Sequence, residues 1–160
     1  MSAFVFESEE MEQIKQKAEV FYHSLKSIPC PYLEGSVVFN AKGLRHLKFK
    51  SDRVARPLKE QYIRLKLLYL VPEVLKKSHT VQGVWNMRKF EEQKINKRKE
   101  NILKDVIYYE FIAVIKSVRI KIIIKEVLGG EKHFWSVIPS WGIDKQNKKR
   151  ILFTGNPDED

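Results

Sequence analysis

Two of the four histidines, His46 and His133, stand beside residues that suit proton transfer or anion binding. His46 ends the stretch "KGLRH", and His133 begins the stretch "HFWS", which ends at Ser136. Histidine titrates near neutral pH, so it can accept and donate a proton within one reaction. His23 and His79 have simpler interpretations, as a structural helix residue and an exposed loop residue.

The spacing of the candidate ligands argues against a metal or cofactor site. The four histidines are far apart, and the chain has no HExxH motif, no CxxC motif and no dense aspartate cluster. These patterns are the usual signs of a catalytic or structural metal ion. Phosphate-loop and dinucleotide-binding motifs are missing as well. We therefore expect chemistry that needs neither a metal nor another cofactor.

Positive charge is concentrated in the middle of the chain. The net charge is +10, and residues 41–104 hold 18 Lys and Arg against 6 Asp and Glu. The start of the chain and its last three residues, 158–160, are acidic. A basic region of this kind attracts polyanions, chiefly nucleic acid, although a merely solvated basic surface has the same composition. We expect contact with nucleic acid.

Three consecutive segments have the composition of β-strands and would position several of the cations. Residues 106–115, 118–128 and 132–138 are rich in Val, Ile, Tyr and Phe, which favour strands. Gly129-Gly130 suits a two-residue hairpin turn, whereas Lys116-Ser117 lacks the usual turn residues. The pattern predicts a three-stranded antiparallel meander.

The register of this meander predicts which side chains share a face. The glycine turn would pair Lys125 with Phe134 and Ile123 with Ser136, and side chains alternate between the two faces. The predicted polar face carries Tyr108, Glu110, Lys121, Lys125 and Ser136. His133 and Trp135 would then lie on the opposite face, with the core isoleucines. A one-residue bulge would reverse this assignment and turn His133 toward the polar face.

Earlier segments are predicted to be mostly helical. Residues 8–27 have the apolar spacing of an amphipathic helix, and residues 36–40 form a short strand pattern. Asn40 can cap a helical turn over residues 41–49, which contains His46. Residues 57–70 again show helical spacing, with a proline at the first turn.

Two charged stretches have weaker patterns. Residues 86–105 are rich in charge and weakly periodic, and we interpret them as an exposed helix or a mobile insertion. Residues 144–150 are basic, and residues 151–155 have the composition of a short edge strand.

Composition bounds the class of protein. A chain of 160 residues that is 43% hydrophobic and 31% charged fits one globular domain with a core of its own. The single cysteine, Cys30, rules out internal disulfides and favours a reducing compartment, so we expect a cytoplasmic protein. The acidic N-terminal stretch does not resemble a secretory signal, and no apolar run approaches the roughly 18 residues of a membrane span. We expect no membrane contact.

Parts of the sequence resemble a known nuclease family. The stretches "VVFNAKGLRHLKFK", "RVARPLKEQYIRLKLLYLVPEVL" and "FIAVIKSVRIKIIIKEVLGGEKHFWSVIPSW" are similar to the phage-associated nuclease domains of the barnase–EndoU–colicin–RelE-like superfamily. The resemblance covers about residues 36–142. Its most specific pieces are Lys42-Gly43 with His46, Glu60-Gln61 with Arg64, and His133 to Ser136.

The resemblance implies a fold and an organisation of the chain. The implied fold is α+β, with N-terminal helices packed on a small antiparallel β-sheet. Residues 1–35 would be an N-terminal helical extension. Residues 36–155 would be the nuclease domain, with a charged insertion at about 86–105, in one compact unit overall.

The resemblance also implies an activity. Many members of the superfamily are metal-independent ribonucleases, and several are toxins or conflict-system effectors. It therefore implies an endoribonuclease acting on tRNA or another structured RNA, with an immunity or antitoxin protein as partner if it is a toxin. The alternative is a nucleic-acid-binding module that keeps the fold without catalysis.

The residues in the matching region can be given roles in metal-free RNA cleavage. A base must take the 2′-hydroxyl proton, an acid must protonate the leaving oxygen, and cations must stabilise the phosphate. His46 is the candidate for proton transfer, with His133 as the competing candidate, and Lys121 is the candidate transition-state cation beside Ser136. The expected substrate-binding residues are Arg56, Gln61, Arg64, Tyr108 and Lys125.

Overall fold

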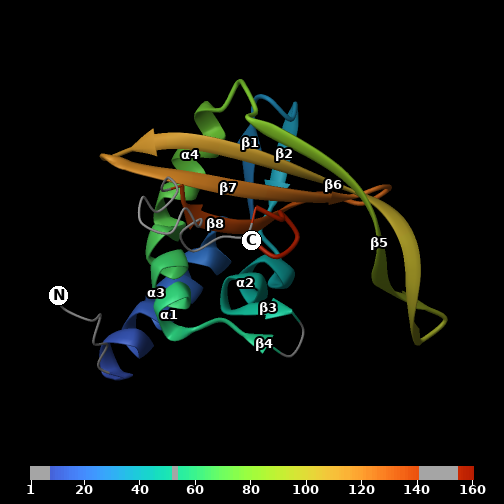
Figure 1. The fold of residues 1–160 in the computed structure, drawn as a ribbon, viewed down its shortest axis with the longest axis horizontal. Coiled ribbons are helices and arrows are strands. Elements are labelled where there is room, and N and C mark those ends of the chain that lie inside the picture. Colours follow the sequence, from blue (N-terminus) through green and yellow to red (C-terminus); the bar gives the residue numbers. More distant parts are fainter. Residues whose placement is uncertain (1–7, 52–53, 141–154) are drawn as a thin grey trace.

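The computed structural model describes residues 8–51, 54–140 and 155–160 and has an α+β fold (Figure 1). The helices are α1 (Ser8–Leu25), α2 (Ala41–Lys48), α3 (Leu58–Leu67) and α4 (Val71–Lys77), with a single 3-10 turn at Leu68–Leu70 between α3 and α4. The strands are β1 (Ser27–Cys30), β2 (Gly35–Val38), β3 (Phe49–Ser51), β4 (Val54–Ala55), β5 (Gly83–Ile95), β6 (Arg98–Ile115), β7 (Val118–Val127) and β8 (Lys132–Pro139). No helix within the described ranges is both long and apolar enough to cross a membrane.

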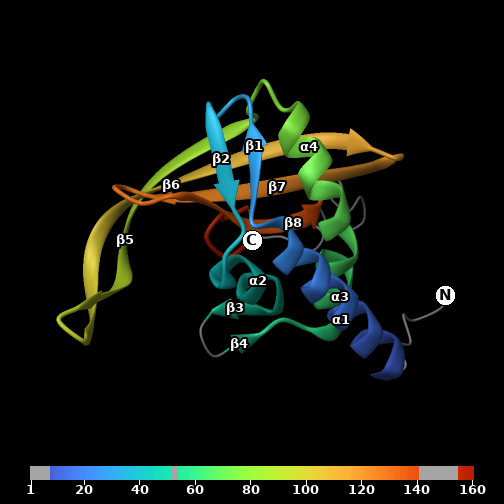
Figure 2. The same ribbon diagram turned by 180° about the vertical axis from the view of Figure 1, so that it is seen from behind.

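The main sheet is large and mixed, which corrects the expectation of a small antiparallel one. Its six strands have the order β1-β2-β8-β7-β6-β5, and β2 runs parallel to β8, with Val38 opposite His133. The parallel pair arises because β2 and β8 are far apart in the chain and are joined by a long crossover, not by a hairpin. The sheet twists so strongly that β1 and β2 cross the direction of β6 and β7 steeply (Figure 2).

The N-terminal helices form as predicted and pack on one face of this sheet. The apolar stripe of α1 buries Met11 and Ala18, and α1 contacts α3. Asn40 caps α2, because its side-chain oxygen accepts a hydrogen bond from the amide of Gly43 at 3.3 Å. The expected extension 1–35 contains β1, which pairs with β2 in the main sheet.

Helix α2 lies unusually close to β8, and this closeness positions His46. A β-carbon added at Gly43 would overlap the carbonyl oxygen of Phe134 and the hydroxyl of Tyr22. Tyr22 in turn donates a hydrogen bond to the carbonyl of Asn40 at 2.6 Å. The glycine in "KGLRH" therefore lets the helix backbone contact the strand directly.

Residues 86–105 belong to a β-hairpin, which corrects the expectation of a helix or mobile insertion. Strands β5 and β6 pair continuously from Gly83 opposite Glu110 to Ile95 opposite Arg98. The turn residues Asn96 and Lys97 both have positive φ, 48° and 66°, which is the geometry of a type I′ hairpin turn. The outer half of this hairpin, residues 88–105, extends beyond the body of the protein and is called the hairpin arm below (Figures 1 and 2).

The predicted meander is confirmed, and its register holds between β6 and β7. Tyr108 pairs with Lys125, as expected. The turn between them is Lys116-Ser117, where both residues have positive φ although neither is glycine or asparagine. The connection between β7 and β8 is longer than the expected two-residue turn, because the strands end at Val127 and resume at Lys132.

A bulge between β7 and β8 corrects the predicted positions of His133 and Trp135. Ile123 pairs with Ser136 as expected, but Lys125 pairs with His133 instead of Phe134. Trp135 is the extra residue, so the strand shifts by one position between Ser136 and Phe134. As a result Phe134 joins the main core under the helices, whereas Trp135 packs with Tyr108 and Ile123 on the other face.

Candidate functional site

Side chains from the second face of the sheet, from α2 and α3, and from the turn before α3 form one group of buried polar residues. Charged side chains are seldom buried unless they are paired, so such a group needs an explanation. We call these residues the polar cluster: His46, Arg56, Gln61, Arg64, Glu110, Lys121, Lys125, His133 and Ser136. Eight of them are among the predicted site residues, and the ninth predicted residue, Tyr108, is fully buried beside them.

His46 is held in its neutral form by Arg56. The guanidinium of Arg56 lies 3.0 Å from Nε2 of His46 and donates a second bond to the His46 carbonyl at 2.9 Å. An arginine can only donate, so Nε2 accepts and the ring proton sits on Nδ1. Burial first, and then the charges of Arg56 and Arg64, lower the pKa of His46 to about 2. In this state the ring carries no charge at neutral pH.

Arg64 and Ser136 converge on one oxygen atom. Nη1 of Arg64 donates to Oγ of Ser136 at 2.7 Å and also contacts the main-chain oxygen of Asp160. The hydroxyl of Ser136 donates to that same oxygen at 2.6 Å. Burial lowers the pKa of Arg64 to about 9, and the nearby charge of Arg56 acts in the same direction.

Trp135 links the helix to the strands of the cluster. Its ring stacks on His46, with centroids 3.9 Å apart and planes 19° from parallel. Nζ of Lys125 lies 4.2 Å from the Trp135 ring and 2.8 Å from a carboxylate oxygen of Glu91. Burial lowers the pKa of Lys125, although the Glu91 carboxylate opposes this effect. The tryptophan therefore belongs to the site, which the predicted register had excluded.

His133 also contacts Trp135, with the two rings edge-on at 6.1 Å. Its buried Nε2 has no hydrogen-bond partner among the residues that the structure describes. Burial first, and then the charge of Lys125, lower its pKa to about 4. Both candidate histidines are therefore neutral at pH 7 in this conformation.

Lys121 occupies a different part of the same face. It forms an ion pair with Glu110 at 3.6 Å, and both side chains are buried. Lys121 lies four positions from Lys125 along β7, which corresponds to about 13 Å. Ser136 pairs with Ile123, midway between the two lysines.

Residues 155–160, called the acidic segment below, lie directly on the polar cluster. The main-chain oxygen of Glu159 accepts a hydrogen bond from Nη2 of Arg56 at 2.7 Å, and that of Asp158 accepts one from the Trp135 indole at 3.2 Å. The carboxylate of Asp158 accepts a bond from the hydroxyl of Tyr108 and pairs with Lys89. Burial would raise the pKa of Asp158, but the bonds from Lys89 and Tyr108 outweigh it and lower the pKa.

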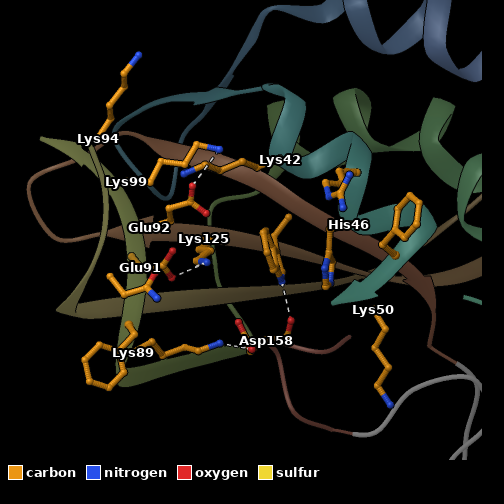
Figure 3. Close-up of a pocket in the computed structure, with 15 residues that line it drawn as sticks. Lys42, His46, Lys50, Lys89, Glu91, Glu92, Lys94, Lys99, Lys125 and Asp158 are labelled. Atoms are coloured by element: carbon orange, nitrogen blue, oxygen red, sulfur yellow. Dashed lines mark hydrogen bonds and ion pairs between the residues drawn. The ribbon is translucent and has the colours of Figure 1, made fainter. Parts of the chain in front are cut away.

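An open cleft of about 560 Å³ lies between α2 and the hairpin arm, with His46 and Trp135 among its lining residues (Figure 3). The lining cations outnumber the acids, which are Glu91, Glu92 and Asp158. The cations are Lys42, Arg45, Lys50, Lys89, Lys94, Lys99 and Lys125, and the aromatic side chains are Phe49, Phe90 and Trp135. A cleft lined in this way can hold phosphates and stack bases.

Several contributors to this site were not predicted from the sequence. Lys89 and Glu91 were placed in an insertion of unknown role, and Asp158 was noted only as acidic. Asn96 in the turn of the arm and the acidic run at 158–160 were the available signals. The predictions for residues 141–154 lie outside the described residues. Among the residues that are described, no group of three or more His, Cys, Asp or Glu side chains is placed to hold a metal ion.

The comparisons with known proteins do not assign a family. No protein-family model matches the chain, and neither the curated proteins nor the solved structures gave a match. The functional argument therefore rests on the geometry and charge of the site.

Proposed function

We propose that this protein binds RNA in the cleft between α2 and the hairpin arm and cleaves it without a metal ion, as an endoribonuclease. The observation that carries the proposal is the pair of contacts that join Arg56 to His46 and Arg64 to Ser136. His46 and Lys125 both pack on Trp135, and all three line a cleft rimmed by cations and aromatic rings. The resemblance to phage-associated nuclease domains adds the proposal of a toxin-like effector in the cytoplasm. Its substrate would be tRNA or another structured RNA, and its partner an immunity or antitoxin protein.

The cleft suits an RNA chain better than a small molecule. Its lysines and Arg45 come from α2, from β3, from β7 and from the arm, so they can neutralise several phosphates at once. Phe90 is largely exposed on the arm, and an exposed aromatic ring in a basic cleft offers a base a stacking surface. These contacts do not read base edges, so the binding they support depends on the backbone and on stacking.

The polar cluster supplies the groups that metal-free cleavage needs. Arg64 and Ser136 both donate to a single oxygen, and a non-bridging oxygen of the scissile phosphate would be held in the same way. His46 is the proposed proton-transfer group, and its pKa must rise from about 2 during the reaction. A bound phosphate acts in this direction, because its negative charge opposes the effect of Arg56 and Arg64 on the ring, whereas burial, the largest cause of the lowered pKa, is relieved only if the site opens.

A second candidate function is RNA binding without cleavage. It is favoured by the burial of both histidines and by their lowered pKa values, about 2 for His46 and about 4 for His133. A histidine with so low a pKa is a weak base and a poor source of protons at neutral pH. The cleft and its cations serve this function equally well.

Incubation of the pure protein with tRNA, with and without EDTA, distinguishes the two candidates. We expect cleavage that EDTA does not change and that falls about 10²–10⁴-fold in His46→Ala, the usual size of an acid–base contribution. His79→Ala is the matched control, because His79 is exposed and outside the cleft. Binding without cleavage by the wild-type protein would favour the second function. Full activity in folded His46→Ala, with none in His133→Ala, would assign proton transfer to His133.

A further inference from the structure

The acidic segment presents oxygen atoms to donors of the site from three consecutive residues. The carboxylate of Asp158 accepts from Tyr108 and pairs with Lys89, neither of which belongs to the polar cluster. The main-chain oxygen of Glu159 accepts from Arg56 of the cluster, and that of Asp160 accepts from Arg64 and Ser136 of the cluster. In each of these contacts the segment supplies an anionic or partially negative oxygen, and the site supplies the donor or the cation.

The buried arginines require such a partner. Arg56 and Arg64 are only 5% and 2% exposed, and an unpaired buried guanidinium is strongly destabilising. Glu60, the nearest side-chain carboxylate to Arg56, lies 4.0 Å away, so the segment supplies the closer oxygens. A phosphodiester could supply oxygens to the same donors with a full negative charge.

The segment makes several polar contacts and forms a small turn of its own. The amides of Glu159 and Asp160 donate to the carbonyl of Asn156 at 3.1 and 2.9 Å, and the amide of Gly155 donates to the carboxylate of Asp160 at 2.9 Å. The one apolar side chain of residues 155–160, that of Pro157, is buried. Contacts of this kind weaken in salt and compete poorly with a polyanion that makes many of them at once.

We infer that residues 158–160 occupy the positions of RNA phosphate oxygens and that RNA must displace the acidic segment in order to reach Arg56, Arg64 and Ser136. The segment is thus an internal competitor that keeps the buried cations paired in the absence of substrate. This inference rests on the proposed RNA-binding function. It goes beyond that function because it states which part of the chain must move and which phosphate contacts become available.

The test uses the full-length chain with Asp158→Asn, which removes one charge from the segment while keeping its size. The apparent affinity of a site is reduced by the fraction of molecules in which it is blocked, so weaker docking raises RNA affinity. Loss of a charge-assisted bond should raise the affinity for labelled tRNA about 10-fold, measured by fluorescence anisotropy. Glu92→Gln is the matched control, because it makes the same charge change inside the cleft without touching the acidic segment and should raise affinity by about twofold at most.

Hydrogen exchange of the same complexes gives a second readout. We expect RNA to increase exchange at the amides of Glu159 and Asp160 and to decrease it in α2 and the hairpin arm. Protection of α2 and the arm with no change in residues 155–160, together with unchanged affinity in Asp158→Asn, would overturn the inference and leave RNA binding intact. No RNA binding by either protein would overturn the proposed function itself. If Asp158→Asn does not fold, Asp160→Asn tests the same docking by removing the charge that closes the turn.

Discussion

Acid should destabilise this protein well above the range in which carboxylates titrate, because two neutral histidines are buried in the site. The pKa of His46 falls from 6.5 to about 2 on folding, and that of His133 falls from 6.5 to about 4. A histidine whose pKa is lowered binds fewer protons when folded than when unfolded. Above pH 6.5 the histidine therefore does not change the free energy of unfolding with pH. As the pH falls from 6.5 toward the folded pKa, the free energy of unfolding decreases.

The loss of unfolding free energy in acid can be calculated from the pKa shifts of His46 and His133. At pH 4.5 the unfolded forms of both histidines are almost fully protonated, whereas the folded forms are mostly neutral. Each histidine lowers the free energy of unfolding by about 1.4 kcal/mol for each pH unit below 6.5. At pH 4.5 this loss amounts to about 2.5 kcal/mol per histidine relative to neutral pH. The combined loss of about 5 kcal/mol is comparable to the whole stability of a typical domain. Asp158 acts in a lower range, because its pKa is lowered from 3.8 and its contribution is lost only below that value.

Urea denaturation at pH 7.0, 5.5 and 4.5, followed by far-UV circular dichroism, measures this loss. His46→Gln keeps an acceptor for Arg56 and should remove about half of the pH dependence between 6.5 and 4.5. His23→Gln is the control, because His23 is exposed and should leave the pH dependence unchanged. An unfolding free energy that is constant from pH 7.0 to 4.5 would refute the reasoning, since it would mean that neither ring is held neutral by burial.

Three further predictions concern binding and packing. If about four of the cleft cations contact phosphates, RNA affinity should fall about 100-fold between 50 and 200 mM salt, and salt-independent binding would contradict this. Gly43→Ala should cost about 1–2 kcal/mol of unfolding free energy in spite of the better helix propensity of alanine, because its β-carbon overlaps Phe134 and Tyr22. Wild-type stability in that variant would show that α2 can move away from β8. Glu91→Gln should cost about 2 kcal/mol, since it removes the charged partner of buried Lys125, whereas Glu92→Gln, which loses only an exposed ion pair, should cost less than about 0.5 kcal/mol.

The sequence was sufficient to predict the meander and most of the polar face. The predicted pairs of Tyr108 with Lys125 and of Ile123 with Ser136 are both present. The predicted register of β8 was wrong only between the glycine turn and Trp135, because the connection is longer than two residues and the bulge at Trp135 then restores the register. A bulge has no strong sequence signature when large residues precede and follow it, so the register alone could not place His133 and Trp135.

The hairpin arm could not be recognised for a different reason. Most side chains of residues 88–105 are exposed on both faces, so no apolar alternation marks the strands. The one local signal was Asn96 in the turn, since asparagine tolerates positive φ better than most residues. Without a buried face, the many charged residues of 88–105 are as compatible with an exposed helix as with a β-hairpin.

The arginines and the acidic segment illustrate why the site was predicted only in part. Arg56 and Arg64 were expected to bind substrate, and both are buried among polar groups. Their burial is stable only with oxygen partners, and the partners in the acidic segment lie 103 positions after Arg56 and 96 positions after Arg64, so no local pattern connects them. Because the buried arginines need oxygen partners, the stability of the site and its binding of ligands are linked. Whatever displaces the segment must itself pair with the two guanidiniums, so the site selects for ligands with closely spaced anionic oxygens and disfavours neutral ones.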